Sequence, residues 1–477
     1  MPRLSEGTLA QWGAGLDTTG NLAIGGAGVI ELAGRFGTPL HVVNYERLLL
    51  HAASFASQFQ SRYAGKVEVY FAAKSNPVAG IIEAVMTAGL GVEVFTPFEL
   101  RLARLAGCPA SRIIVNGPAK TRDFLSECIG AGVHLIVADS LREVEQMIDL
   151  ARKRDTSVDI LLRANVDYVP RGMNRGSATA SRGSVFGMTR EELVQAAHIC
   201  SHDSLVRFRG LHTHIGSGIR HASAYRDACR ILCRIALELR DKTGAAIDYL
   251  DIGGGFGTPM VREFSDLEFL LYHGLNRAPA PPAPEEAPAF GAFAEMIAEP
   301  VTRAFGDRSL PLPTLVLEPG RCLVSSNQLL LLRVLAVKRK SGHRDYVVTD
   351  GGQMPVNFPT FYEYHALLCC REPFRAPAPA VDVIGRGCHS ADYVLRNAAL
   401  PPVEEGDVLA VMDSGAYFLS FEGNFGFPRS AVVAVGNGTA SLLRRAETYE
   451  DMLSREQIDA AGQPENPKEA LRHDPAR

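Results

Sequence analysis

The sequence contains few cysteines, and their arrangement does not suggest disulfides. Its nine cysteines are scattered over 477 residues, apart from the neighbours Cys369 and Cys370, and no C-x-x-C pair occurs. A chain of this length can build a large core without disulfides, so we expect its thiols to be reduced. This predicts a cytoplasmic protein.

Long apolar runs and concentrated charge are also missing. No stretch approaches 18 consecutive apolar residues, and the N-terminal segment lacks the apolar core of a secretory signal. The formal net charge is −4, and there is no long basic block. We therefore expect neither a membrane nor a nucleic-acid partner. With 46% hydrophobic and 21% charged residues, the composition is typical of a globular protein, here of two domains.

Strand-like and helix-like segments alternate regularly from about residue 40 to residue 320. The strand-like runs occupy residues 67–73, 91–96, 112–117, 134–139, 159–166, 206–217, 247–255 and 313–320. Amphipathic stretches such as 140–154 lie between them. About eight such repeats predict an α/β fold, a parallel (β/α)8 barrel over residues 41–320, with an open doubly wound sheet as the alternative.

The pattern changes after residue 320, where strand-like runs follow one another without intervening helices. They occupy residues 328–340, 345–351, 380–388, 407–417 and 430–438. This predicts a second, antiparallel β domain, a barrel or sandwich, formed by residues 1–40 and 321–445. Residues 446–477 are charged and contain prolines, which predicts a C-terminal tail with a short helix.

Several polar residues fall where the predicted barrel strands end, at the face that carries the active site in this fold. Lys74 follows one strand, Arg163 lies in another and His214 follows a third. A lysine at a strand end can simply be a solvated cap. If it is buried beside Phe71, we expect desolvation to lower its pKa, as an amine nucleophile requires.

A glycine run supplies a second candidate feature. Gly253, Gly254 and Gly255 follow an apolar strand and could present backbone N–H groups to a phosphate; a plain tight turn is the alternative. The run is not a dinucleotide fingerprint, because Thr258 occupies the position of its last glycine. The turn Glu318-Pro319-Gly320-Arg321 adds a fork-shaped phosphate donor and a carboxylate. A lysine, a phosphate cradle and a carboxylate for a protonated ring nitrogen together indicate a pyridoxal 5'-phosphate (PLP) site.

Six motifs occur in an order that resembles one known family. They are YFAAKSN, GLHTHIGSG, LDIGGGFG, EPGRCLV, GCHSAD and SGAYF. The chain resembles the barrel-type (fold-type III) PLP-dependent amino acid decarboxylases, the group of diaminopimelate, ornithine and arginine decarboxylases, over about residues 35 to 440. The resemblance implies a PLP-dependent decarboxylase that forms a homodimer with shared active sites.

The resemblance also implies roles for individual residues. Lys74 would form the Schiff base, and His214 would stack on the pyridine ring. Glu318 would pair with the pyridine nitrogen, and Cys388 of the partner subunit would protonate the carbanion at Cα. The implied contacts to the phosphate and the site lining are Ser217, Gly253, Gly254, Gly255, Gly320, Arg321, Tyr417, Arg163 and Glu99.

Departures from the family pattern concern the substrate. The implied substrate-binding positions are Phe358, Tyr362, His389 and Asp392. Phe358 stands where diaminopimelate decarboxylases carry an arginine for the distal carboxylate, and His389 stands where they carry a glutamate. Losing the arginine leaves a distal carboxylate unpaired, which argues against diaminopimelate and favours a basic or a conjugated amino acid. Asp392 is interpreted either as a contact to a distal amine or as a helix cap. A further departure is Glu93, where the family has an aspartate.

Other activities remain open at this point. A PLP-dependent racemase uses a similar barrel, but Glu318 near the ring nitrogen favours decarboxylation. His212 and His214 form an H-x-H pair that could bind zinc in a hydrolase, yet no further ligand set is evident, and we expect no metal. An inactive relative is the last alternative, which Lys74, His214 and Cys388 oppose. Residues 169–187, rich in Gly, Ser and Arg, are interpreted as a lid or as a plain flexible loop.

Overall fold

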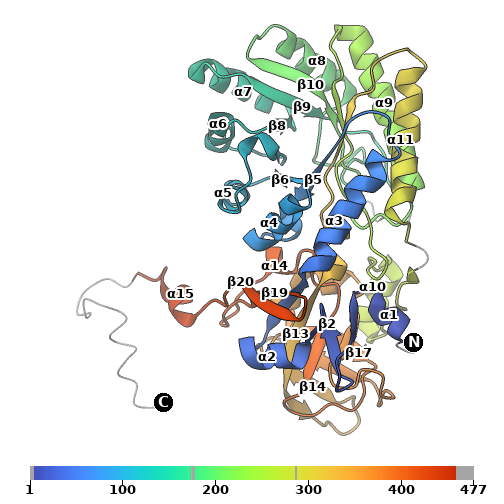
Figure 1. The fold of residues 1–477 in the computed structure, drawn as a ribbon, viewed down its shortest axis with the longest axis vertical. Helices are drawn as coiled ribbons and strands as arrows, with labels where there is room; N and C mark the ends of the chain where they lie inside the picture. The colour runs from blue at the N-terminus through green and yellow to red at the C-terminus, as the bar shows by residue number, and fades with distance from the viewer. Residues whose placement is uncertain (1–4, 172, 174–177, 285–286, 458–477) are drawn as a thin grey trace.

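The computed structural model describes residues 5–457 except 172, 174–177 and 285–286, and for residues 357 and 358 it describes only the helical backbone. Its upper part in Figure 1 is a closed barrel of eight parallel strands. The strands are β5 (Val67–Ala72), β6 (Gly91–Val94), β7 (Ile113–Val115), β8 (Leu135–Ala138), β9 (Val158–Arg163), β10 (Val206–His212), β11 (Tyr249–Asp251) and β12 (Thr314–Leu317). Neighbours in the barrel follow in chain order. The predicted (β/α)8 barrel is confirmed, and the alternative of an open sheet is wrong.

Helices cover the outside of the barrel. They are α3 (Tyr45–Gln60), α4 (Ala79–Thr87), α5 (Pro97–Leu105), α6 (Arg122–Ala131), α7 (Leu141–Arg154), α8 (Arg190–Ser201), α9 (Ser223–Thr243) and α11 (Phe290–Gly306). Helix α7 shows why such segments are helical: the Ser140 side chain caps its first turn, and basic residues fill its last turn. Its buried residues recur every three or four positions, at Val144, Met147, Leu150 and Ala151.

The lower part of Figure 1 is built on a nine-stranded sheet. Its strands are β4 (Leu40–Asn44), β13 (Gln328–Lys338), β14 (Tyr346–Thr349), β15 (Leu367–Cys369), β16 (Val381–Ile384), β17 (Tyr393–Ala398), β18 (Val408–Val411), β19 (Ala431–Gly436) and β20 (Thr439–Arg444). Most pairs are antiparallel, but β14–β16 and β4–β19 are parallel. The predicted second β domain is confirmed, with these two parallel pairs as the difference.

The N-terminal segment packs on this sheet. It contains α1 (Glu6–Ala10), a small sheet of β1 (Ala14–Leu16), β2 (Leu22–Ile24) and β3 (Ala27–Gly28), and α2 (Val29–Phe36). Trp12 and Leu22 share an apolar core with Leu329 of β13. Strand β4, which the predicted boundary at residues 40 and 41 assigned to the barrel, pairs with β13 and β19. All residues of β4 are buried. Its sequence pattern is therefore the same as that of a barrel strand, and the pattern alone does not tell which sheet it joins.

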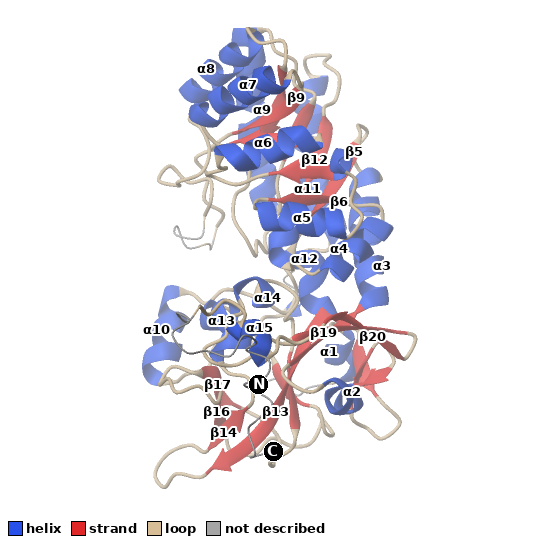
Figure 2. Ribbon diagram, turned by 90° about the vertical axis from the view of Figure 1, so that its left-hand side faces the viewer, coloured by secondary structure: helices blue, strands red, loops and turns tan. Residues whose placement is uncertain are grey.

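Helices also occur where the sequence predicted strands only. They are α13 (Gln353–Tyr362) and α14 (Phe418–Phe421). The tail contains α15 (Tyr449–Leu453), a short helix as predicted there. Figure 2 shows α14 on the second domain facing α12 (Arg321–Val324) of the barrel; α10 (Asp266–Leu275) also lies beside the second domain. Two hydrogen bonds cross this junction close to β5, from Tyr417 N–H to Ser75 O (2.7 Å) and from Ser420 Oγ to Lys74 O (2.5 Å). Within the described ranges, no helix combines the length and apolarity that a membrane span needs.

Candidate active site

Every barrel strand ends in or beside a polar side chain, and these side chains meet at one mouth. In chain order they are Lys74, Glu93, Asn116, Asp139, Arg163, His212, Asp251 and Glu318. Parallel strands of a barrel all point the same way, so their C-terminal ends form a common rim. The rim faces the second domain, whose Tyr417 contacts the turn that carries Lys74. This mouth is the candidate active site.

Lys74 lies in a short 3-10 turn directly after β5, and its Nζ donates to Glu93 Oε2 at 2.8 Å. Burial lowers the pKa of Lys74, but attraction to Glu93 and Glu318 outweighs burial, and the net shift is upward. The predicted lowering of this pKa is therefore wrong. The sequence places Lys74 in an apolar setting, but it does not show that the next strand brings a buried carboxylate to the amine.

Glu318 is the centre of a buried hydrogen-bonded group. It is 3% exposed, and its Oε1 accepts a hydrogen bond from Asn116 Nδ2 at 2.5 Å. Its Oε2 lies 3.5 Å from His212 Nε2, and its carboxyl also shares a hydrogen bond with Asp251. Burial lowers the pKa of His212 well below its usual range, so this imidazole is neutral. An anionic carboxylate held in this way can pair with a protonated ring nitrogen.

The glycine run forms a tight loop against two neighbouring segments. A Cβ on Gly255, whose φ is +88°, would lie 1.9 Å from Gly216 O, so this position requires glycine. The Gly254 N–H donates to His214 Nδ1 at 3.1 Å and holds the ring. No hydrogen bond within the described chain uses the backbone N–H of Gly255 or of Phe256. These two donors can bind an anionic group such as a phosphate.

Arg321 lies near this loop, and part of its guanidinium is already hydrogen-bonded. Its two terminal nitrogens donate to the two carboxylate oxygens of Glu363, each at 2.7 Å, while its Nε lies 3.4 Å from Ser217 Oγ. The guanidinium also lies 5.0 Å from the ring centroid of Tyr417. A guanidinium has five N–H donors, and Glu363 and Ser217 account for three of them, so two are left for a further acceptor. The role predicted for Arg321 at a phosphate stays a prediction, and Glu363 is its unexpected partner.

The remaining residues predicted at the barrel mouth have structural partners. Arg163 lies 3.4 Å from Asp139 Oδ1 and stacks on Phe186 at 4.4 Å. Glu99 accepts a hydrogen bond from the Phe95 N–H at 2.8 Å. A Cβ on Gly320 would lie 2.9 Å from the Ser75 side chain, so glycine allows its turn to approach that of Lys74. In the predicted lid, 172 and 174–177 lie outside the described residues, and the lid stays a prediction.

One group at the mouth has the spacing of metal ligands, but it does not include the H-x-H pair. Among the described residues, ligand atoms of His212, Asp251 and Glu318 lie within 4.8 Å of one another. His214 instead accepts a backbone hydrogen bond. A divalent cation would require both carboxyls to be ionised, whereas burial raises the pKa of Asp251 well above its usual range.

The residues predicted to contact the substrate lie in the second domain. Cys388 and His389 are exposed on the loop after β16, and no contact to Lys74 is found among the described residues. Tyr362 is 42% exposed at the end of α13 and stacks on Phe269 at 5.6 Å. Phe358 is a helical position of α13, and its side chain lies outside the described residues. Among the described side chains, Cys388, His389 and Tyr362 form no hydrogen bond or ion pair with Lys74 of the same chain, and the predicted roles stay predictions.

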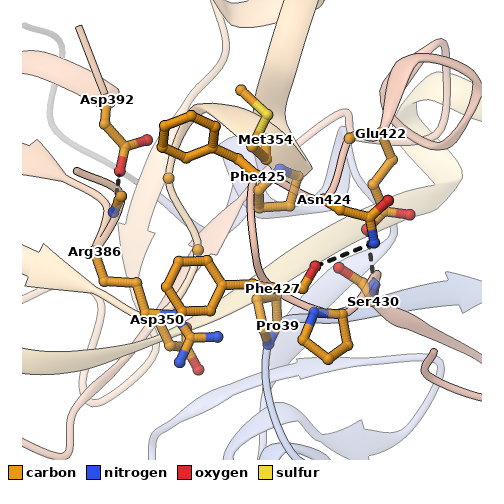
Figure 3. A pocket seen from close by; sticks show the side chains of 16 residues that line it. Pro39, Asp350, Met354, Arg386, Asp392, Glu422, Asn424, Phe425, Phe427 and Ser430 are labelled. Atoms are coloured by element: carbon orange, nitrogen blue, oxygen red, sulfur yellow. Dashed lines mark hydrogen bonds between the residues drawn. The ribbon is translucent and has the colours of Figure 1, made fainter. Parts of the chain in front are cut away.

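Asp392 has two backbone partners. Its Oδ1 accepts from the Gln353 N–H at 2.6 Å, and its Oδ2 accepts from the Gly387 N–H at 2.7 Å. Figure 3 shows this carboxylate at the edge of a small pocket, in which Arg386 stacks on Phe427 at 4.0 Å. Asp392 thus caps α13, whose preceding residue has no side chain to do so. Of the two interpretations, the structure supports the cap, and the substrate contact is not part of our proposal.

Sequence reasoning missed several buried residues of the site. Asn116, Asp139 and Asp251 follow or end a barrel strand, so the rule that singled out Lys74 could have found them. Nothing in the local sequence around Glu363 indicates that it belongs to the site. It lies in the second domain, 42 positions from Arg321 in the chain.

Comparisons with known proteins agree with the geometry. A family profile described as "Pyridoxal-dependent decarboxylase, pyridoxal binding domain" matches residues 50–325. The diaminopimelate decarboxylase of Actinosynnema pretiosum subsp. auranticum is 34% identical over 92% of this chain and 93% of its own. That of Methanothermobacter thermautotrophicus is 30% identical over 92% of this chain and 96% of its own.

A solved structure agrees as well. The crystal structure of diaminopimelate decarboxylase from M. jannaschi has a TM-score of 0.82 at 26% identity and covers 95% of this chain and 99% of its own. These matches confirm the resemblance and the predicted cofactor, and they favour a decarboxylase over a racemase or a metal-dependent hydrolase. The chain belongs to the pyridoxal-dependent decarboxylases, a family of PLP-dependent carboxy-lyases.

Proposed function

We propose that this protein removes the α-carboxylate of a basic or conjugated amino acid, with PLP attached to Lys74. The observation that carries the proposal is the convergence of Lys74, Glu318 and the glycine loop on one barrel mouth. The family's cofactor fits this mouth. The unpaired N–H groups of Gly255 and Phe256 can bind its phosphate, and the buried carboxylate of Glu318 can pair with its ring nitrogen. When bound, PLP accepts the electron pair that the departing carboxylate leaves behind.

The chain's own residues then have defined tasks. Glu318 stays anionic and holds a proton at the ring nitrogen, and His214 packs against the ring. The N–H groups of Gly255 and Phe256 bind the phosphate, together with Ser217 and the Arg321 guanidinium beside it. Cys388 donates a proton from its Sγ to the substrate Cα. We propose that it does so in the partner subunit of a cytoplasmic homodimer, because Cys388 is exposed and separate from the barrel mouth of its own chain.

The distal end of the substrate is inferred from α13. The helix QMPVNFPTFY contains no basic residue, so it offers no cation to a distal carboxylate. This favours a substrate whose distal end is an amine or a conjugate. Free diaminopimelate is the second candidate, favoured by the names of the relatives at 30% and 34% identity.

A substrate panel tests the proposal. We expect CO2 release from carboxyl-labelled lysine, ornithine or a diamino acid acylated at its distal amine to exceed release from diaminopimelate, by roughly the 10-fold or more that an unpaired carboxylate implies. Faster turnover of diaminopimelate would reject the inference from α13 and leave the decarboxylase intact. A purified protein that cannot be loaded with PLP would reject the whole proposal.

Subunit complementation tests the role of Cys388. We expect Cys388→Ala to reduce CO2 release by roughly 10²-fold, the lower range for loss of a general acid, with PLP binding unchanged. Mixing Cys388→Ala and Lys74→Ala subunits under exchange conditions should restore part of the activity, because one site of the mixed dimer is then complete. If the mixture stays inactive while mixed dimers form, Cys388 does not act across the interface.

A further inference from the structure

Asp251 is a fully buried carboxyl at the end of β11 that has no part in the proposed reaction. Its Oδ1 accepts a hydrogen bond from the Gly253 N–H at 2.8 Å. No N–H or O–H group of the described chain donates to its Oδ2. The neighbouring carboxyl is that of Glu318: an oxygen atom of each lies within 4.8 Å of the other, so the two can share a side-chain hydrogen bond.

A hydrogen bond between two carboxyls requires a proton on one of them, because an ionised carboxylate only accepts. Nearby cations do not neutralise Asp251: Lys74 pairs with Glu93 at 2.8 Å, and Arg163 lies near Asp139 at 3.4 Å. The charged and titratable groups near Asp251 on the surrounding strands are Tyr70, Glu93, Arg163, His212 and Glu318.

The two carboxyls differ in their other partners, and this decides which one holds the proton. Burial raises the pKa of Glu318 as well, but the charges of Lys74 and Arg163 and the Asn116 amide, which donates at 2.5 Å, all favour its anion. Asp251 receives only one backbone N–H. Burial, and then the charge of Glu318, raise the pKa of Asp251 well above its usual range.

We propose that Asp251 acts as a neutral acid, which donates a hydrogen bond to Glu318 and holds that carboxylate, as an anion, where the pyridine nitrogen meets it. Asp251 is thus a positioning residue. The inference rests on the proposed role of Glu318 at the cofactor ring.

An amide of the same shape should replace a neutral acid. In Asp251→Asn, Nδ2 can donate to Glu318 while Oδ1 still accepts from Gly253. In Asp251→Leu, the volume is similar but both hydrogen bonds are lost. We expect the PLP affinity and the turnover rate of Asp251→Asn to lie within about threefold of the wild-type values. In Asp251→Leu, we expect both to fall by roughly 10- to 100-fold, as for the loss of a hydrogen bond to a charged group.

The cofactor's visible absorption band provides a readout other than activity. The pH titration of this band reports the environment of the ring nitrogen. The midpoint of the titration should therefore be the same in Asp251→Asn as in wild type, and it should be shifted in Asp251→Leu. If Asp251→Asn behaves like Asp251→Leu, the negative charge is needed, and the proposal is overturned. It is also overturned if both variants behave like wild type.

Infrared spectroscopy tests the proton directly and does not depend on Asp251→Leu folding. The difference spectrum between wild type and Asp251→Asn should contain the C=O stretch of a protonated carboxylic acid at neutral pH, shifted in D2O. Its absence overturns the inference. If the band is present but wild type does not bind PLP, the proposed function fails while the protonated Asp251 stands.

Discussion

Replacing Lys74 with alanine is expected to abolish covalent attachment of PLP and to reduce CO2 release by about 10³-fold or more, since both cofactor attachment and a proton-transfer group are lost. The amine is held 2.8 Å from Glu93 at the barrel mouth. The variant should still bind PLP non-covalently, because the glycine loop and Arg321 are unchanged. Visible absorption and CO2 release measure the two effects.

The chain contains an internal control for this prediction. Lys120 is a second lysine near the barrel mouth, and it is buried; its Nζ donates to Gly117 O at 2.7 Å and pairs with Glu143 at 2.8 Å. Borohydride reduction of the wild-type holoenzyme should therefore leave the cofactor mass on the peptide that contains Lys74 and not on the one that contains Lys120. Labelling of Lys120, or an unchanged visible band in Lys74→Ala, contradicts the assignment.

Glu363→Leu is expected to lower the free energy of unfolding by about 3–5 kcal/mol, because it leaves the buried Arg321 without a counter-charge. Glu363 receives two hydrogen bonds of 2.7 Å from Arg321, and the pair joins the barrel to the second domain. The double variant Arg321→Met/Glu363→Leu should recover most of the loss, since an apolar pair can replace a buried ion pair. Urea unfolding followed by circular dichroism measures all three proteins.

An exposed pair with similar geometry is the matched control. Arg308 donates to both oxygens of Asp241 at 2.9 and 2.7 Å, but these side chains are 45% and 49% exposed. Asp241→Leu should therefore change the free energy of unfolding by less than about 1 kcal/mol. If Asp241→Leu and Glu363→Leu lower the free energy of unfolding equally, burial is not the reason for the larger loss expected in Glu363→Leu. So would a double variant that is no more stable than Glu363→Leu.

The same ion pair has a predictable pH dependence. Burial raises the pKa of Glu363, but Arg321 and His365 outweigh it and hold the pKa at about 2. A carboxyl whose pKa is lower in the folded protein stabilises it above the pKa of the unfolded chain. The stability difference between wild type and Glu363→Leu should thus be complete at neutral pH and decline as the pH falls toward about 2.

Much of the fold follows from local patterns in the sequence. The runs 67–73 and 134–139 correspond to β5 and β8, because short, largely apolar segments bounded by turns can only be buried strands here. Helix α13 was not predicted, because Pro359 within it removes one backbone donor and looks like a break. The predicted domain boundary at residues 40 and 41 left most of β4 with the barrel, because a fully buried segment has the same pattern in either domain.

The sequence by itself determined the barrel, the second β domain and several residues at the strand ends, namely Lys74, His214, the glycine loop and Glu318. These depend on periodicity and on the rule that parallel strands end at one rim. Only the tertiary structure decided how these groups are charged. Three features arise between segments far apart in the chain. They are the raised pKa of Lys74, the raised pKa of Asp251 beside Glu318, and the pairing of Arg321 with Glu363. Electrostatic energies depend on distances of a few ångströms and on burial, and a pattern of residues along the chain contains neither.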